Sequence, residues 1–119
     1  MADSVLRNKS KEFAKSIVFL CRKMKQNGVE SALINQLLRC GTSVGANIHE
    51  AQYAQGKKDF ISKLEIALKE SSETGYWLEL LYRTKYIDEL TFKELSSKCT
   101  SLRVMLISSC KTAKQNIEK

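Results

Sequence analysis

The chain contains no proline in 119 residues, and this absence limits its fold more than any other feature. Proline is the strongest breaker of helices, so a chain without it can form long uninterrupted helices. The apolar residues recur at steps of three, four and seven, which is the spacing of one face of a helix. Hydrophobic residues make up 43% of the chain, enough for a real core, and the charged residues are mostly Lys, Arg and Glu. The sequence therefore predicts an all-α protein.

Four helical segments are separated by short polar turns, so we expect a single domain over residues 1–119. Short connections favour antiparallel neighbours, and the predicted fold is an antiparallel up-down-up-down four-helix bundle. The expected segments run from Asp3 or Ser4 to Gln26, from Glu30 or Ser31 to Ala54, from Asp59 to Lys85, and from Thr91 onward. The predicted caps are Ser4, Asp59 and a Thr91–Glu94 capping box at helix starts, and Asn27–Gly28 at the end of the first helix.

Gly41 and Gly45 lie four residues apart inside the second helical segment. Each costs about 1 kcal/mol of helix stability relative to alanine, so their presence suggests that another backbone comes close. Tight packing against a neighbouring helix is the preferred interpretation. A phosphate-binding loop is a poor alternative, because residues 41–45 lack the Walker spacing and its Gly-Lys-Ser/Thr ending. A broken helix, or a ligand close to the backbone, remains open.

The net charge of +7 is concentrated at the two ends of the chain. Residues 1–26 carry a net charge of +5, residues 27–97 carry −2, and residues 98–119 carry +4. If the first and last helices are neighbours, they form one positive surface that attracts RNA or DNA. A solvated face that keeps the protein soluble is the competing interpretation. The candidate nucleic-acid-binding residues are Lys9, Lys11, Lys15, Arg22, Lys23, Lys25, Arg103, Lys111 and Lys114. Few aromatic residues interleave with them, which favours phosphate contacts over base stacking.

A polar layer is expected between the second and third helices, where charged residues of the two segments can face each other. A satisfied structural network is the preferred interpretation. A magnesium or nucleotide site, or a small-molecule or nucleotide-processing enzyme acting through Glu50, Glu70 and Glu73, is the weaker alternative. His49 is the only histidine, so a di-iron site with two Glu-x-x-His pairs is excluded, and we expect no metal or other cofactor. The network residues are Arg39, Asn47, Glu50, Lys63, Glu70 and Glu73.

The second and third segments each carry an additional apolar row. A helix with two apolar rows needs two packing partners, so these rows predict either a central position in the bundle or contacts between subunits of an oligomer. Trp77 is either a core residue or an anchor of such an interface. The candidates for this interface are Ile34, Leu38, Trp77 and Leu81.

The four cysteines point to a reducing environment. None of them has the C-x-x-C spacing of a redox or zinc motif, and we expect them to be small core residues. No N-terminal apolar run resembles a signal peptide, and no stretch approaches 18 consecutive apolar residues. We therefore expect a cytoplasmic protein with free thiols and no membrane contact.

Three runs of sequence carry a specific resemblance. They are QLLRCGTSVGANIHEA at 36–51, KDFISKLEIALKE at 58–70 and ETGYWLELL at 73–81. Together they resemble the bacterial four-helix-bundle proteins encoded in intervening sequences of large-subunit ribosomal RNA genes, also called ribosomal protein-like. His49 departs from the alanine usual in the motif, which argues further against a role for this histidine.

The resemblance implies a left-handed up-down bundle that assembles as a homopentamer, with no known enzymatic activity. A related branch is similar too, namely the accessory proteins of diversity-generating retroelements, which bind a reverse transcriptase and nucleic acid. The expected function is therefore a non-enzymatic, pentameric scaffold that binds RNA or DNA through its basic first and last helices. The alternative is an adaptor that binds a protein partner, such as a reverse transcriptase-like protein, and has no nucleic-acid role.

Overall fold

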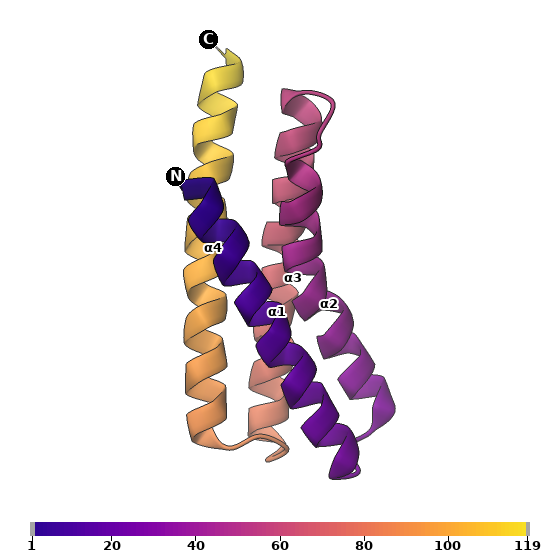
Figure 1. The fold of residues 1–119 in the computed structure, drawn as a ribbon. Coiled ribbons are helices and arrows are strands. Elements are labelled where there is room, and N and C mark those ends of the chain that lie inside the picture. Colours follow the sequence, from indigo (N-terminus) through magenta and orange to yellow (C-terminus); the bar gives the residue numbers. More distant parts are fainter. Residues whose placement is uncertain (1, 119) are drawn as a thin grey trace.

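Four helices form an antiparallel bundle in the computed structural model, which describes the backbone of residues 2–118 and the side chains of residues 4–116 (Figure 1). They are α1 (Ala2–Gln26), α2 (Ser31–Ala51), α3 (Lys57–Arg83) and α4 (Glu89–Glu118). Successive helices run in opposite directions, and the described residues contain no strand. The predicted all-α, up-down-up-down four-helix bundle is thus confirmed.

α1 ends at a left-handed glycine, as the sequence predicts. The backbone φ angle of Gly28 is 76°. The N–H of Gly28 donates to the carbonyl of Lys25 at 3.2 Å, and the N–H of Val29 donates to the carbonyl of Met24 at 3.1 Å. These two bonds satisfy carbonyls that the end of a helix leaves free.

α3 ends with the same pair of hydrogen bonds, although no glycine is present. The N–H of Lys85 donates to Tyr82 at 3.0 Å, and the N–H of Tyr86 donates to Leu81 at 2.9 Å. Lys85 occupies the left-handed position, with a φ angle of 68°. A side chain is strained in this conformation, so the turn after α3 holds a position that glycine would fill more easily.

The predicted start of the last helix is wrong. α4 begins at Glu89, and Asp88 caps it by accepting a hydrogen bond at 2.7 Å from the N–H of Thr91. Thr91 therefore lies in the first turn of the helix, and the Thr91–Glu94 capping box does not form. Two acceptable caps lie three residues apart, and the aspartate is the one that the chain uses.

Three other predicted boundaries are also displaced. α1 begins at Ala2, so Ser4 lies inside the helix and does not cap it. Asp59 lies inside α3, and its carboxylate accepts a hydrogen bond at 3.3 Å from the N–H of Gln55 in the preceding turn. α2 ends at Ala51, earlier than predicted.

The apolar stripes of the four helices meet in one core. All four cysteines are buried in it, as expected for small core residues. Each large apolar side chain that is fully buried contributes about 1.5–3 kcal/mol to stability. The largest fully buried apolar side chains are Phe13, Ile17, Met24, Leu37, Leu78, Leu81, Leu102 and Leu106.

Gly41 and Gly45 bring α2 close to α1. A Cβ atom at position 41 would lie 2.9 Å from Cγ2 of Ile17, and one at position 45 would lie 3.3 Å from the carbonyl oxygen of Ser10. The helix continues through both glycines without a break. Tight helix packing is therefore confirmed as their role, and the broken-helix alternative is wrong.

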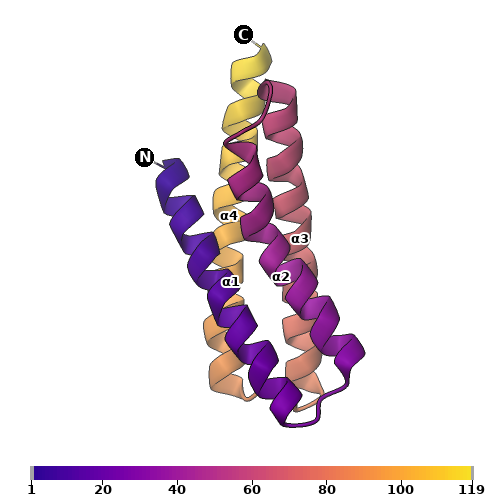
Figure 2. The same cartoon turned by 45° about the vertical axis from the view of Figure 1, so that its right-hand side comes forward.

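α1 crosses the bundle at an angle to the other helices. Its first turns stand apart from α2 in both views, whereas its last turns lie beside the start of α2 (Figures 1 and 2). This splay opens one end of the bundle, where α1 faces the end of α2 and the start of α3.

Candidate nucleic-acid interface

The outer face of α1 is basic. Its inner face is fixed by the burial of Phe13, Ile17 and Met24, and this leaves the lysines and the arginine on the solvent side. Every predicted cation of this helix is exposed, namely Lys9, Lys11, Lys15, Arg22, Lys23 and Lys25.

None of these six cations lies within ion-pair distance of a described carboxylate. The ion pairs of the described residues involve side chains of α2, α3 and α4 only. The described part of α1 therefore carries an excess of positive charge, since its carboxylate Glu12 forms no ion pair with these cations and offsets only part of their charge. An excess of exposed cations on the solvent side of one helix is the electrostatic footprint that binds a phosphate backbone.

An exposed aromatic ring lies within this basic face, which the sequence analysis did not identify. Phe19 is 53% exposed. Its ring centroid lies 6.0 Å from Nζ of Lys15 and 5.9 Å from the guanidinium carbon of Arg22. The signal was present in the spacing, because Lys15 and Arg22 lie four residues before and three residues after Phe19 on one helix.

Two of the three predicted cations of α4 are directed toward α3. Arg103 is half-buried on the side of α4 that faces α3, with Nη1 4.0 Å from the position of a Cβ atom at Gly75. Lys114 pairs with Glu65 of α3 at 3.4 Å. Lys111 is exposed. Arg103 and Lys114 are thus directed toward α3, and their part in a positive surface shared by the first and last helices stays a prediction.

A different lysine of α4 approaches α1. Lys98 and Lys9 line the same groove between the two helices, together with Phe13 and Leu102. Lys98 is partly neutralised by Glu94, which lies 3.3 Å away on α4. The positive surface is thus built on α1, and α4 adds one paired lysine to its edge.

The predicted polar network between α2 and α3 exists in two separate parts. Arg39 pairs with Glu70 at 3.1 Å and also with Glu73. The indole N–H of Trp77 donates to Glu73 at 3.0 Å. This bond and the adjacent guanidinium hold the pKa of Glu73 below its usual value. The arrangement joins two helices through satisfied partners, which is the structural interpretation.

The second part of the network consists of Lys63 and Glu50, whose charged atoms lie 3.2 Å apart. Asn47 joins neither part, because its side-chain N–H group donates to the carbonyl of Ser43 within α2 at 2.9 Å. Among the described residues, no group of three or more His, Cys, Asp or Glu side chains is placed to hold a metal ion. Nothing in these described arrangements points to catalysis.

Two of the four predicted interface residues are core residues of a single chain. Ile34 is 7% exposed and Leu81 is 0% exposed, so neither has surface to offer to a second subunit. Leu38 and Trp77 are half-buried and pack against the core. Leu81 was misplaced because the apolar stripe of α3 is wider than the one row that the sequence analysis assigned to the core.

The fold and this surface define a small all-α bundle protein with one basic helix face. Residues 2–108 match the family model described as 23S rRNA-intervening sequence protein, and the chain belongs to this family. The predicted family resemblance is therefore confirmed.

A solved structure from Bacteroides thetaiotaomicron VPI-5482 is similar over almost the whole chain. It is described as a protein with unknown function from the S23 ribosomal protein family. The two sequences are 48% identical, the match covers 93% of this chain and 99% of the other, and the TM-score is 0.91. Comparison with curated proteins finds no match. No described helix is both long enough and apolar enough to cross a membrane.

Proposed function

We propose that this protein is a non-enzymatic, homo-oligomeric scaffold that binds RNA or DNA through the basic face of α1. The observation that carries the proposal is the set of six exposed cations on the solvent side of one helix, none of them paired with a described carboxylate. Such a set of cations would follow a phosphate backbone and bind it with little regard for sequence.

Phe19 adds a second kind of contact to this face. An exposed ring between two cations offers a stacking surface for an unpaired base, while Lys15 and Arg22 hold the flanking phosphates. Stacking of this kind requires a base that is not already paired. Single-stranded nucleic acid is therefore the preferred ligand of the proposed surface.

The description of the family supports the proposed binding of RNA, because it refers to an intervening sequence of 23S rRNA. The solved relative is assigned to a ribosomal protein family. The proposed assembly is a homopentamer, as the family resemblance implies. Five copies of a weak basic face on one particle would bind a polyanion far more tightly than one copy does.

The test is the affinity of the purified protein for single-stranded RNA and duplex DNA, measured by fluorescence anisotropy together with the particle mass by light scattering. If six cations contact phosphates, the affinity should fall by roughly 10²–10³-fold between about 50 and 200 mM salt. Phe19→Leu should weaken single-stranded RNA binding more than duplex binding. A particle that binds neither ligand at low salt would refute the proposal.

A protein-binding adaptor is the second candidate, and the outer surface of α4 favours it. Val104 is 58% exposed and Ile107 is 50% exposed, on a helix whose inner face already packs in the core. Exposed apolar residues near each other on one helix are suited to a protein contact. A partner that is retained after nuclease treatment and high salt, and is lost with Val104→Ser and Ile107→Ser, would favour this candidate.

A further inference from the structure

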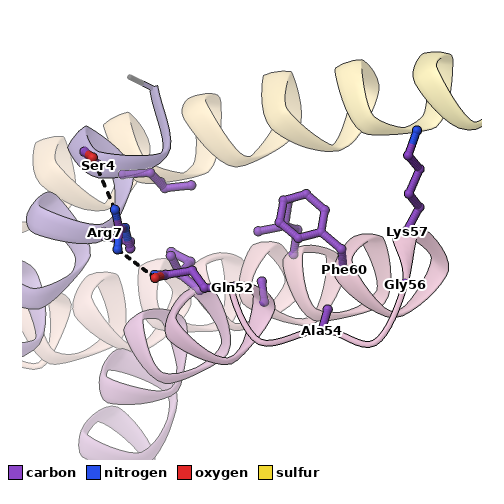
Figure 3. A pocket seen from close by; sticks show the side chains of 11 residues that line it. Ser4, Arg7, Gln52, Ala54, Gly56, Lys57 and Phe60 are labelled. Atoms are coloured by element: carbon purple, nitrogen blue, oxygen red, sulfur yellow. Dashed lines mark hydrogen bonds between the residues drawn. The ribbon is translucent and has the colours of Figure 1, made fainter.

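The splayed end of the bundle contains a pocket that neither candidate function uses. It has a volume of about 580 Å³ and lies between the first turns of α1, the end of α2, the 52–56 turn and the start of α3 (Figure 3). Pockets of roughly 300–1,000 Å³ are typical of sites that hold small molecules.

The floor of the pocket is apolar. Leu6, Ile48, Ala51 and Leu64 line it, and all four are buried in the bundle. The half-buried ring of Phe60 lies between the two ends of the pocket (Figure 3). An apolar group of a ligand would therefore leave water on entering this space.

The guanidinium of Arg7 forms one wall of the pocket, and two hydrogen bonds fix its position. Arg7 donates from Nη1 to the side-chain oxygen of Gln52 at 2.7 Å and from Nη2 to the hydroxyl of Ser4 at 3.2 Å. Its Nε atom is buried and has no hydrogen-bond partner among the described residues. Lys57 lies at the opposite end of the pocket (Figure 3).

No described carboxylate neutralises the charge of this wall. No Asp or Glu occurs among the 11 residues that line the pocket, and both partners of Arg7 are neutral. A half-buried guanidinium without a carboxylate is unfavourable, because the charge has lost much of its water and has gained no counter-charge. Nη1 and Nη2 each carry two N–H groups and each makes one described hydrogen bond, so the planar guanidinium keeps donors that match the geometry of a carboxylate.

We propose that this pocket binds a small organic carboxylate with an apolar tail. The guanidinium of Arg7 takes the carboxylate, and the floor formed by Leu6, Ile48 and Leu64 takes the tail. Lys57, at the opposite end of the pocket, adds a weaker, longer-range attraction. This inference does not depend on nucleic-acid binding, since it rests on Arg7 and the apolar floor of the pocket and on none of the six cations of the proposed nucleic-acid face.

The experiment titrates octanoate into isotopically labelled protein and follows the amide signals by NMR. Acetate carries the charge without the tail, and 1-octanol carries the tail without the charge, so both should bind at least about tenfold more weakly than octanoate. The shifted signals should come from residues that line the pocket. Equal binding of octanoate and 1-octanol would overturn the proposal, and so would shifts confined to other surfaces.

Two kinds of variant test the charge of Arg7 and the volume of the pocket separately. Arg7→Gln should weaken octanoate at least about tenfold, Arg7→Lys should weaken it less, and the matched control Arg83→Gln, on the far end of α3, should leave it unchanged. Ala54→Phe fills the pocket and keeps Arg7, so it tests the site even if Arg7 variants fail to fold. Octanoate affinity that survives Ala54→Phe would refute the site.

Discussion

Replacing Gly41 by alanine should destabilise the bundle, although alanine is the better helix former. The new Cβ atom would lie 2.9 Å from Cγ2 and 3.0 Å from Cγ1 of Ile17. Ile17 is fully buried, and its branched side chain is stiff about χ1, so it cannot move aside cheaply. Overpacking of this kind costs about 1–3 kcal/mol, and we take the upper end because both clashing atoms are next to the Ile17 Cβ atom.

The gain in helix propensity offsets about 1 kcal/mol of this cost, which leaves a net loss of about 2 kcal/mol. For a chain of 119 residues the unfolding entropy is about 0.25 kcal/mol/K, so Tm should fall by about 8 °C. The assay is thermal unfolding by circular dichroism at a fixed protein concentration.

Gly75→Ala is the matched control on α3. The nearest atom to its Cβ position is Nη1 of Arg103 at 4.0 Å, so alanine fits without a clash. This variant should raise Tm by about 2–4 °C through helix propensity alone. Gly41→Ala placed on an Ile17→Ala background should cost much less than it does alone, because the clash is then gone. A Gly41→Ala protein with an unchanged or raised Tm would show that α1 and α2 can accommodate the added methyl group without a clash.

Three further predictions concern a turn, a cap and the buried thiols. Lys85→Gly should stabilise the protein by about 0.5–1 kcal/mol in urea unfolding, because it relieves the left-handed backbone after α3; a lower midpoint would count against this. Hydrogen bonds from Thr91 hold the pKa of Asp88 below its usual value, so its contribution is present at neutral pH and declines as the pH falls below about 4. Asp88→Asn should keep the cap and make the thermal midpoint less dependent on pH in that range, and an unchanged dependence would speak against the role of Asp88. Burial raises the pKa of Cys21 and Cys99 to about 11. Both thiols should resist alkylation at about pH 8 until the protein is unfolded, as checked by mass spectrometry, and rapid labelling of the native protein would contradict their burial.

The fold could be predicted from sequence because its determinants are local and periodic. The absence of proline and the apolar stripes defined four helices, and Gly28 marked the end of α1. Helix starts were less accurate because several polar residues near each start can act as caps. Asp88 and Thr91 are both good caps, and only the path of the preceding turn decides between them.

The exposure of the basic residues could be predicted only where it follows from the apolar stripe of their own helix. The solvent side of α1 follows from its own apolar stripe, so its cations were placed correctly as exposed residues. The direction of Arg103 and Lys114 depends on how α4 is rotated against α3, which periodicity alone does not give. The pocket near Arg7 could not be predicted at all, since it results from the angle at which α1 leaves the bundle.

The most direct measurement of the central claim compares two triple variants in single-stranded RNA binding across a salt series. Lys11→Gln, Lys15→Gln and Arg22→Gln neutralise the α1 face, and Lys58→Gln, Lys69→Gln and Lys93→Gln remove the same charge from exposed positions on α3 and α4. The α1 variant should lose affinity by at least about tenfold and its log–log salt slope should become shallower by about 2, while the control should stay close to the wild type. Equal losses in the two variants would show that only net charge matters, and unchanged binding by the α1 variant would place the interface elsewhere.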